Sequence, residues 1–250
     1  MAIKMGWAEV DITPKKGTKI GLAGQFFERI TDEVESPITV TAFALEGDGE
    51  KMVVASCDLV AVDRRMHTLV KAKVESVYPE LKGKVITNAI HTHTSYVYKR
   101  EFIDPNSSLS VLKNILPEGM EYKPLVSNEK MLDPEVARDF LVEKIAQAVC
   151  KAWEDRTDGY YANAFGRAAV GMCRRVCYDD GSAKMWGDSN LANFEELESG
   201  NDSGIELIYT FDKNKELNGV IANIDGWYDA YDVTPDQKFY RSPEERVHIW

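Results

Sequence analysis

The chain has 250 residues, of which 44% are hydrophobic and 28% charged, as is typical of a soluble globular protein. Its 30 basic and 41 acidic residues give a net charge of -11, which argues against a broad electrostatic contact with nucleic acid or anionic lipid. No apolar run is long enough for a membrane span, and the first residues lack the apolar core of a secretion signal. We therefore expect a cytoplasmic protein whose four cysteines are free thiols.

The first part of the chain predicts strands. The segment "GWAEVDITP" alternates between apolar and polar residues and breaks at Pro14, which indicates a short strand entering a turn. The glycine-rich "KKGTKIGLAGQ" is expected to be a loop. Residues 38–56 alternate around "GDGE", which predicts a β-hairpin, and both of its faces are apolar enough to be covered.

A helix and a further strand follow this hairpin. Apolar residues at helical spacing predict a helix that Pro79 stops: Met66, Leu69, Val70, Val74 and Val77. The segment "GKVITNAIHTHT" is then predicted to be a strand. Strand, helix and strand in this order are typical of an α/β fold with a right-handed crossover.

The second half of the chain predicts an irregular loop, a helix and two hairpins. Residues 95–132 have weak periodicity and are expected to be a long loop. Asp133 and Pro134 predict the start of a helix. Its expected apolar side comprises Val136, Phe140, Ile145, Val149 and Trp153. The hairpins are predicted to turn at Asp180-Gly181 and within "DKNKE", whereas residues 225–250 have no apolar period and are expected to pack poorly.

Two histidines one residue apart, His91 and His93, are the first candidates for a functional site. On a strand such residues face the same side, and two imidazoles at a strand end can bind one zinc ion. They can equally be two polar residues that close a strand and are satisfied by hydrogen bonds. This pattern occurs in several unrelated hydrolase classes, so it names no chemistry alone.

Other polar residues are candidates for supporting roles. Arg174 and Arg175 occupy a predicted apolar strand, so one of them should point inward, where a guanidinium can bind a carboxylate or stabilise an oxyanion. The alternative for this arginine is an ordinary salt bridge. Asp58 ends a predicted strand and can either orient a ligand histidine or cap the following helix.

These pieces resemble the N-terminal part of the neutral/alkaline non-lysosomal ceramidase family. The most specific likeness is "ITNAIHTHTS", which resembles the family's histidine-containing segment. The other similar segments, in chain order, are "GWAEVDITP", "GLAGQ", "ITVTAFALEGDGEKMVVASCDLV", "VGMCRRVCYDDGSAKMWG" and "SGIELIYTFDKNKELNGVIANI". The likeness spans about residues 6 to 224.

The resemblance implies a fold, a chemistry and three site residues. The fold would be α/β, with mixed sheets and packed helices, and the activity a zinc-dependent cleavage of N-acyl amides such as ceramide. His91 matches the family's first zinc ligand, His93 the histidine beside the reacting atoms, and Arg174 the arginine near the reacting centre. We therefore predict that these three side chains converge on one concave surface, where a small N-acyl amide or lipid would bind.

The chain also departs from the family. Cys173 replaces an asparagine, no histidine follows "GVIANI" until His248, and the family's glutamate and tyrosine ligands have no counterpart. We therefore expect an incomplete member, with a ceramidase-like domain over residues 1–224, a diverged tail over 225–250 and little amidase activity. The alternatives are a non-catalytic α/β domain that binds a small molecule or a partner, and another histidine metallohydrolase that uses Asp58 as a ligand.

Overall fold

The computed structural model describes residues 3–24, 29–99, 131–169, 171, 173–185, 187–200 and 202–224. The predicted tail, with His248, and most of the predicted loop over 95–132 lie outside these residues. The chain forms two compact units, the first mainly from Met1–Tyr161 and Thr210–Gly219, the second from Ala162–Tyr209 and Val220–Ile249. Each unit is described by itself.

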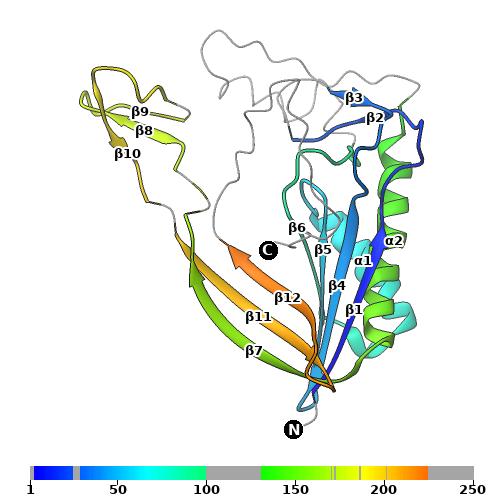
Figure 1. The fold of residues 1–250 in the computed structure, drawn as a ribbon. Helices are drawn as coiled ribbons and strands as arrows, with labels where there is room; N and C mark the ends of the chain where they lie inside the picture. Colours follow the sequence, from blue (N-terminus) through cyan, green and yellow to red (C-terminus); the bar gives the residue numbers. More distant parts are fainter. Residues whose placement is uncertain are drawn as a thin grey trace. The chain divides into compact units, whose positions relative to one another are not determined.

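Strands make up most of the secondary structure, and helices lie between some of them in the first unit (Figure 1). In chain order the elements are β1 (Ile3–Asp11), β2 (Ile20–Gly21), β3 (Ile30–Thr31), β4 (Thr39–Gly47), β5 (Glu50–Cys57), α1 (Arg64–Val77), the short 3-10 helix η1 (Pro79–Leu81), β6 (Val85–Ala89), α2 (Pro134–Glu154), β7 (Thr157–Arg167), β8 (Arg175–Tyr178), β9 (Ala183–Met185), β10 (Phe194–Leu197), β11 (Gly204–Asp212) and β12 (Leu217–Ile224).

The larger sheet is mixed, with the strand order β12-β11-β7-β1-β4-β5-β6. β4 is antiparallel to both β1 and β5, whereas β5 and β6 are parallel. Helix α1 connects β5 to β6, so the strand, helix and strand expected from the sequence are present (Figure 1). The α/β fold class is therefore confirmed.

The predicted hairpin is formed by β4 and β5 and turns tightly at Asp48 and Gly49. Both residues have positive φ, 51° and 81°, as a two-residue turn that follows the right-handed twist of its strands requires. Glycine adopts this conformation freely, and aspartate is among the residues that tolerate it best. The dipeptide therefore sets the register of the hairpin, in which Gly47 pairs with Glu50.

Helices α1 and α2 cover one face of β1, β4 and β5 (Figure 1). Each buried aliphatic side chain in this layer contributes roughly 1.5–3 kcal/mol. The layer includes Val10, Val40, Ala42, Val53, Ala55, Met66, Val70, Val74, Leu141, Ile145 and Val149. On the opposite face, Thr41, Phe43 and Ser56 are also buried, so the prediction that both faces are covered is confirmed for this part of the hairpin.

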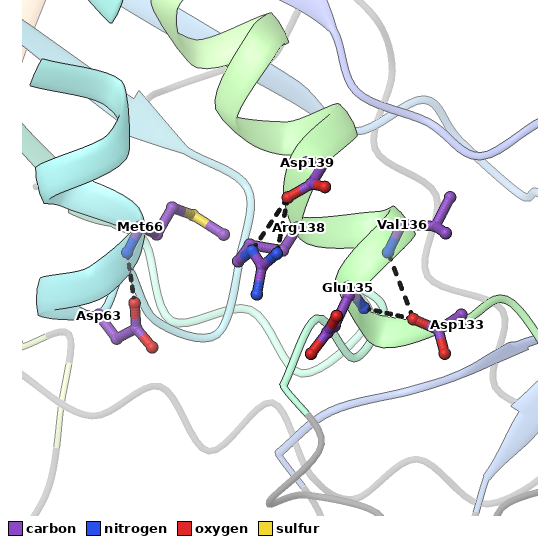
Figure 2. Close-up of polar contacts among 7 residues, drawn as sticks. All are labelled: Asp63, Met66, Asp133, Glu135, Val136, Arg138 and Asp139. Atoms are coloured by element: carbon purple, nitrogen blue, oxygen red, sulfur yellow. Dashed lines mark hydrogen bonds and ion pairs between the residues drawn. The ribbon is translucent and has the colours of Figure 1, made fainter. Parts of the chain in front are cut away.

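Helix α2 begins where the sequence predicts, because Asp133 caps it. Its carboxylate accepts hydrogen bonds from the backbone N–H groups of Glu135, at 2.8 Å, and Val136, at 3.4 Å (Figure 2). The expected apolar side is partly wrong, since Val136 and Phe140 are 58% and 37% exposed. The helix instead buries a side rich in small residues: Ala137, Leu141, Ile145, Ala148, Val149 and Ala152.

The alanines of α2 matter because they let the helix backbone approach the sheet. A Cβ atom at Gly6 of β1 would collide with the carbonyl oxygen of Ala152. The stripe expected from side-chain size therefore included two exposed residues, Val136 and Phe140, and omitted the buried alanines. The same error affects α1, where Leu69 and Val77 are exposed and only Met66, Val70 and Val74 of the predicted stripe are buried.

Asp63 caps helix α1 and joins it to the segment that follows β6. Its Oδ1 accepts a hydrogen bond from the backbone N–H of Met66 at 2.7 Å (Figure 2), and its Oδ2 lies 2.8 Å from Nζ of Lys99. Burial alone raises the pKa of Asp63, but the hydrogen bonds from Lys99 and Met66 outweigh it and lower the pKa below its usual value. The carboxylate is therefore charged at neutral pH.

The two later hairpins form at their predicted turns. In the second unit, Gly181 has a φ of 77° and follows Asp180, whose Oδ1 accepts from the N–H of Ser182 at 2.8 Å. Here β8 pairs with both β9 and β10. The other turn lies in the first unit, where Asp212 accepts from the N–H groups of Asn214 and Glu216. The four cysteines are free thiols, and no helix in the described parts of the chain is long and apolar enough to cross a bilayer.

Candidate metal centre

The two histidines lie in the loop after β6, which ends at Ala89, and not on the strand itself. His91 has a φ of 62°, in the left-handed region that non-glycine residues occupy at a cost of roughly 1–2 kcal/mol. The strand alternation that predicts a shared face therefore does not apply to this segment. A backbone conformation of this kind often marks a functional position.

The imidazoles of His91 and His93 nevertheless meet. Their Nε2 atoms lie 3.3 Å apart, and their ring centroids are 4.9 Å apart with the planes at 72°. The expectation that the two side chains project together is thus met by a turn of the backbone and not by strand geometry.

The backbone carbonyl of Val60 orients His91. The Nδ1 atom of His91 lies 2.7 Å from that oxygen, which can only accept a hydrogen bond. Nδ1 therefore donates to this oxygen, and in the neutral imidazole the lone pair of Nε2 is on the side of His93. Metal-binding histidines are commonly fixed in this way, through a carbonyl that holds the other ring nitrogen.

Ser95 holds Val60 in place. Its hydroxyl accepts a hydrogen bond from the backbone N–H of Val60 at 3.2 Å, and the serine is fully buried. Tyr96, the next residue, is also buried, and its hydroxyl donates to the carbonyl of Ile12 at 2.9 Å. Burial raises the pKa of the Tyr96 phenol far above its usual value, so this side chain packs as a neutral group.

Asp58 neither orients His91 nor caps helix α1. Its Oδ2 accepts hydrogen bonds from the backbone N–H of Thr39, at 2.8 Å, and from that residue's hydroxyl, at 3.3 Å. It therefore ties the end of β5 to the start of β4, while Val60 orients His91 and Asp63 caps α1.

The spacing of the histidine nitrogens suits two ligands of one zinc ion. Two ligand atoms at ~2.0–2.1 Å from a tetrahedral zinc lie about 3.3–3.4 Å apart. A catalytic zinc usually has three protein ligands. Over the parts of the chain that the structure describes, no group of three or more His, Cys, Asp or Glu side chains could hold a metal ion. The described residues thus fit two of the positions around a zinc ion.

Arg174 belongs to the second unit and directly precedes β8. Its side chain is half-buried. Its neighbour Arg175 forms the salt bridge that the sequence allowed for one member of the pair, with Nε 2.7 Å from Oε1 of Glu198. The convergence of Arg174 with the two histidines stays a prediction.

Several residues around the histidines were not anticipated from the sequence. They are Val60, Ser95, Gly24 and Arg29. The glycine-rich run and the position of Ser95 beside the motif were available signals, but no local pattern marks Arg29 or a backbone carbonyl such as that of Val60.

The structure is similar to solved ceramidases. It superposes on the neutral ceramidase from Pseudomonas aeruginosa with a TM-score of 0.62 and 19% sequence identity, over 90% of this chain and 32% of that one. A ceramidase complexed with C2 gives a TM-score of 0.60 at 20% identity, over 90% of this chain and 31% of the other. This chain has a ceramidase-like fold.

At this level of identity the likeness establishes the fold alone. The chain spans about a third of the length of these ceramidases, 32% and 31%. No protein-family model matches the sequence, and no curated protein does.

Proposed function

We propose that the ceramidase-like fold of this chain carries a metal-dependent amide hydrolase site in which His91 binds zinc and His93 lies beside the reacting atoms. The observation that supports this most is the pair of Nε2 atoms 3.3 Å apart, with the tautomer of His91 set by the Val60 carbonyl. The substrate class is an N-acyl amide, in line with the resemblance to the ceramidase family.

His91 would hold the zinc ion, which would supply polarisation of the acyl carbonyl and a water molecule acidic enough to attack near neutral pH. The residues of the chain have separate tasks around this chemistry. His91 offers Nε2 as a ligand, because its other nitrogen is committed to Val60. His93 can accept a proton at Nε2, or donate one there to the leaving nitrogen. Arg174 would stabilise the negative charge that develops on the acyl oxygen.

We expect weak turnover from this chain. Among the described residues, His91 offers one ligand and His93 at best a second, whereas a catalytic zinc usually has three protein ligands. Loss of a ligand weakens metal binding and with it the activation of both carbonyl and water. The second candidate function is a non-catalytic α/β binding domain. The lack of a third metal ligand among the described residues favours it. Metal content distinguishes this binding domain from the hydrolase.

The test compares the wild type with His91→Ala and a matched control, His67→Ala. His67 lies on α1, where its Nδ1 is 2.8 Å from the hydroxyl of Thr87, so its removal takes away an imidazole elsewhere. Zinc per chain is measured at equilibrium with a fixed concentration of free zinc, and hydrolysis of short N-acyl amides and ceramide is followed with added zinc. We expect about one zinc per chain in the wild type and in His67→Ala, and none in His91→Ala.

The two hypotheses give different outcomes. If none of the three proteins binds zinc, the proposal is wrong and the non-catalytic domain is the hypothesis that remains. Fast turnover that disappears only in His91→Ala would mean that the chain completes its own site, which contradicts the expectation of weak activity but supports the metal assignment. His93→Ala then separates a second ligand, whose loss lowers the zinc content, from a proton-transfer group, whose loss lowers only turnover.

A further inference from the structure

We propose that Gly24 and Arg29 are positioning residues that hold the imidazole of His93 against that of His91. The two residues make independent contacts with His93, one with its ring and the other with its backbone carbonyl. Both contacts hold the rings in the metal-free protein, and their effect on zinc binding rests on the proposed function.

The first contact is between Gly24 and the ring. Gly24 has a φ of 95°, which L side chains rarely adopt. A Cβ atom built at this position would collide with Cγ, Cδ2 and Nδ1 of His93. The backbone of Gly24 thus lies directly against the imidazole, and any larger residue must displace the ring or the loop.

The second contact is made by Arg29. Its Nη2 donates hydrogen bonds to the carbonyl oxygens of Ala23, at 2.9 Å, and His93, at 2.6 Å. Hydrogen bonds from a charged donor are stronger than those between neutral groups. The guanidinium of Arg29 therefore links Ala23, which precedes Gly24, to His93.

A short backbone pairing brings these two segments together. The N–H of Ala23 donates to the carbonyl of Ser95 at 2.9 Å, and the N–H of Val97 donates to the carbonyl of Gly21 at 2.8 Å. An isolated bridge also links Leu22 with Tyr96. This pairing aligns the glycine-rich loop with the segment just after His93, but it does not reach His93 itself.

The contacts of Gly24 and Arg29 with His93 thus continue this pairing as far as the histidine. Gly24 packs against one side of the His93 ring, and His91 lies beside its Nε2 atom. Arg29 holds the backbone carbonyl of His93 through a hydrogen bond. His91 is held separately, through Val60. Preorganised rings need less reordering on metal binding, and loss of such outer contacts typically weakens metal affinity 10- to 100-fold.

The test uses Gly24→Ala, Arg29→Met and Arg29→Lys, with Arg65→Met as the control because Arg65 is exposed on α1. Proteins with isotope-labelled histidine are studied without metal, and the nuclear Overhauser contact between the two rings is recorded. Each is then titrated with zinc, and melting temperatures confirm that each variant is folded. We expect the ring contact to be lost and the zinc affinity to fall at least tenfold in Gly24→Ala and Arg29→Met.

Arg29→Lys should recover part of both readouts, because an ammonium group can still donate to a carbonyl, and Arg65→Met should match the wild type. If a variant is folded and keeps the wild-type ring contact, the substituted residue has no positioning role. If Gly24→Ala does not fold, Arg29→Met decides. A wild type that shows the ring contact but binds no zinc contradicts the proposed function and leaves the positioning roles intact. A wild type without the contact overturns the positioning.

Discussion

Two regions of the first unit are stabilised by different interactions. One is the helix-covered layer, in which α1 and α2 pack on the sheet, and the other is the histidine corner, formed by Val60, His91, His93 and Ser95. In the layer, many aliphatic side chains of α1, α2 and the sheet are buried together, so no single contact decides its geometry. In the corner, single hydrogen bonds hold Val60 and His91. Stability is therefore concentrated in the layer, and the precision of the candidate site depends on a few polar contacts.

The largest expected effect is a cavity in the layer. Ile145→Ala removes a fully buried side chain from α2 and should lower the free energy of unfolding by about 2–5 kcal/mol. Val136→Ala, on the same helix but 58% exposed, should change it by less than about 0.5 kcal/mol. Urea denaturation measures both. Equal effects would show that α2 does not bury the side described here.

A smaller effect is expected from the hydroxyl that holds Val60. Ser95→Ala leaves the buried N–H of Val60 without its acceptor and should destabilise the protein by roughly 1–3 kcal/mol. It should also weaken zinc binding, because Val60 orients His91. The control is Ser76→Ala on the exposed side of α1, where the hydroxyl donates to the carbonyl of Lys73. A loss of stability with unchanged zinc affinity would separate Ser95 from the candidate site.

The ion pair of Asp63 with Lys99 should make a pH-dependent contribution. Since the pKa of Asp63 is lowered in the folded protein, its contribution is present above the unfolded pKa of about 3.9 and is lost as the pH falls through the folded pKa. Asp63→Asn keeps a capping side chain, so at pH 7 we expect a loss of about 0.5–1 kcal/mol.

That loss should shrink toward zero below pH 4, which denaturation curves at several pH values measure. The control is Asp139→Asn, because the side chain of Asp139 is 69% exposed and pairs with Arg138 (Figure 2). This variant should change the free energy of unfolding little at any pH. A loss from Asp63→Asn that is the same at pH 3 and pH 7 would contradict the ionic contribution.

An effect of similar size tests the backbone strain at His91. His91→Gly and His91→Ala both remove the imidazole, but only alanine keeps the unfavourable positive φ. The glycine variant should therefore be more stable by about 1 kcal/mol. The same pair of substitutions at Asp48, whose φ is 51°, should give a similar difference in a turn. Equal denaturation midpoints for the two His91 variants would mean that the loop relaxes to another conformation.

Much of the fold could be predicted from the sequence because its signals are local. Asp133 and Pro134 start α2, Pro79 limits α1, and Asp48-Gly49 forms the hairpin turn, each through chemistry within a few residues. The alternation of the hairpin and the spacing of Met66, Val70 and Val74 identified a strand pair and a helix. The histidine pair was also recognisable, since its two members lie one residue apart.

Tertiary structure decided the remaining features, because they depend on which backbones approach one another. The buried side of α2 is set by its close contact with Gly6, which the size of individual side chains did not indicate. His91 and His93 meet through a left-handed turn and not through strand alternation. Their supports, Val60 and Arg29, are separated from them by 31 and 64 residues along the chain. Contacts over such distances arise only when β5, β6 and the glycine-rich loop have been assembled, so no local pattern in the sequence could specify them.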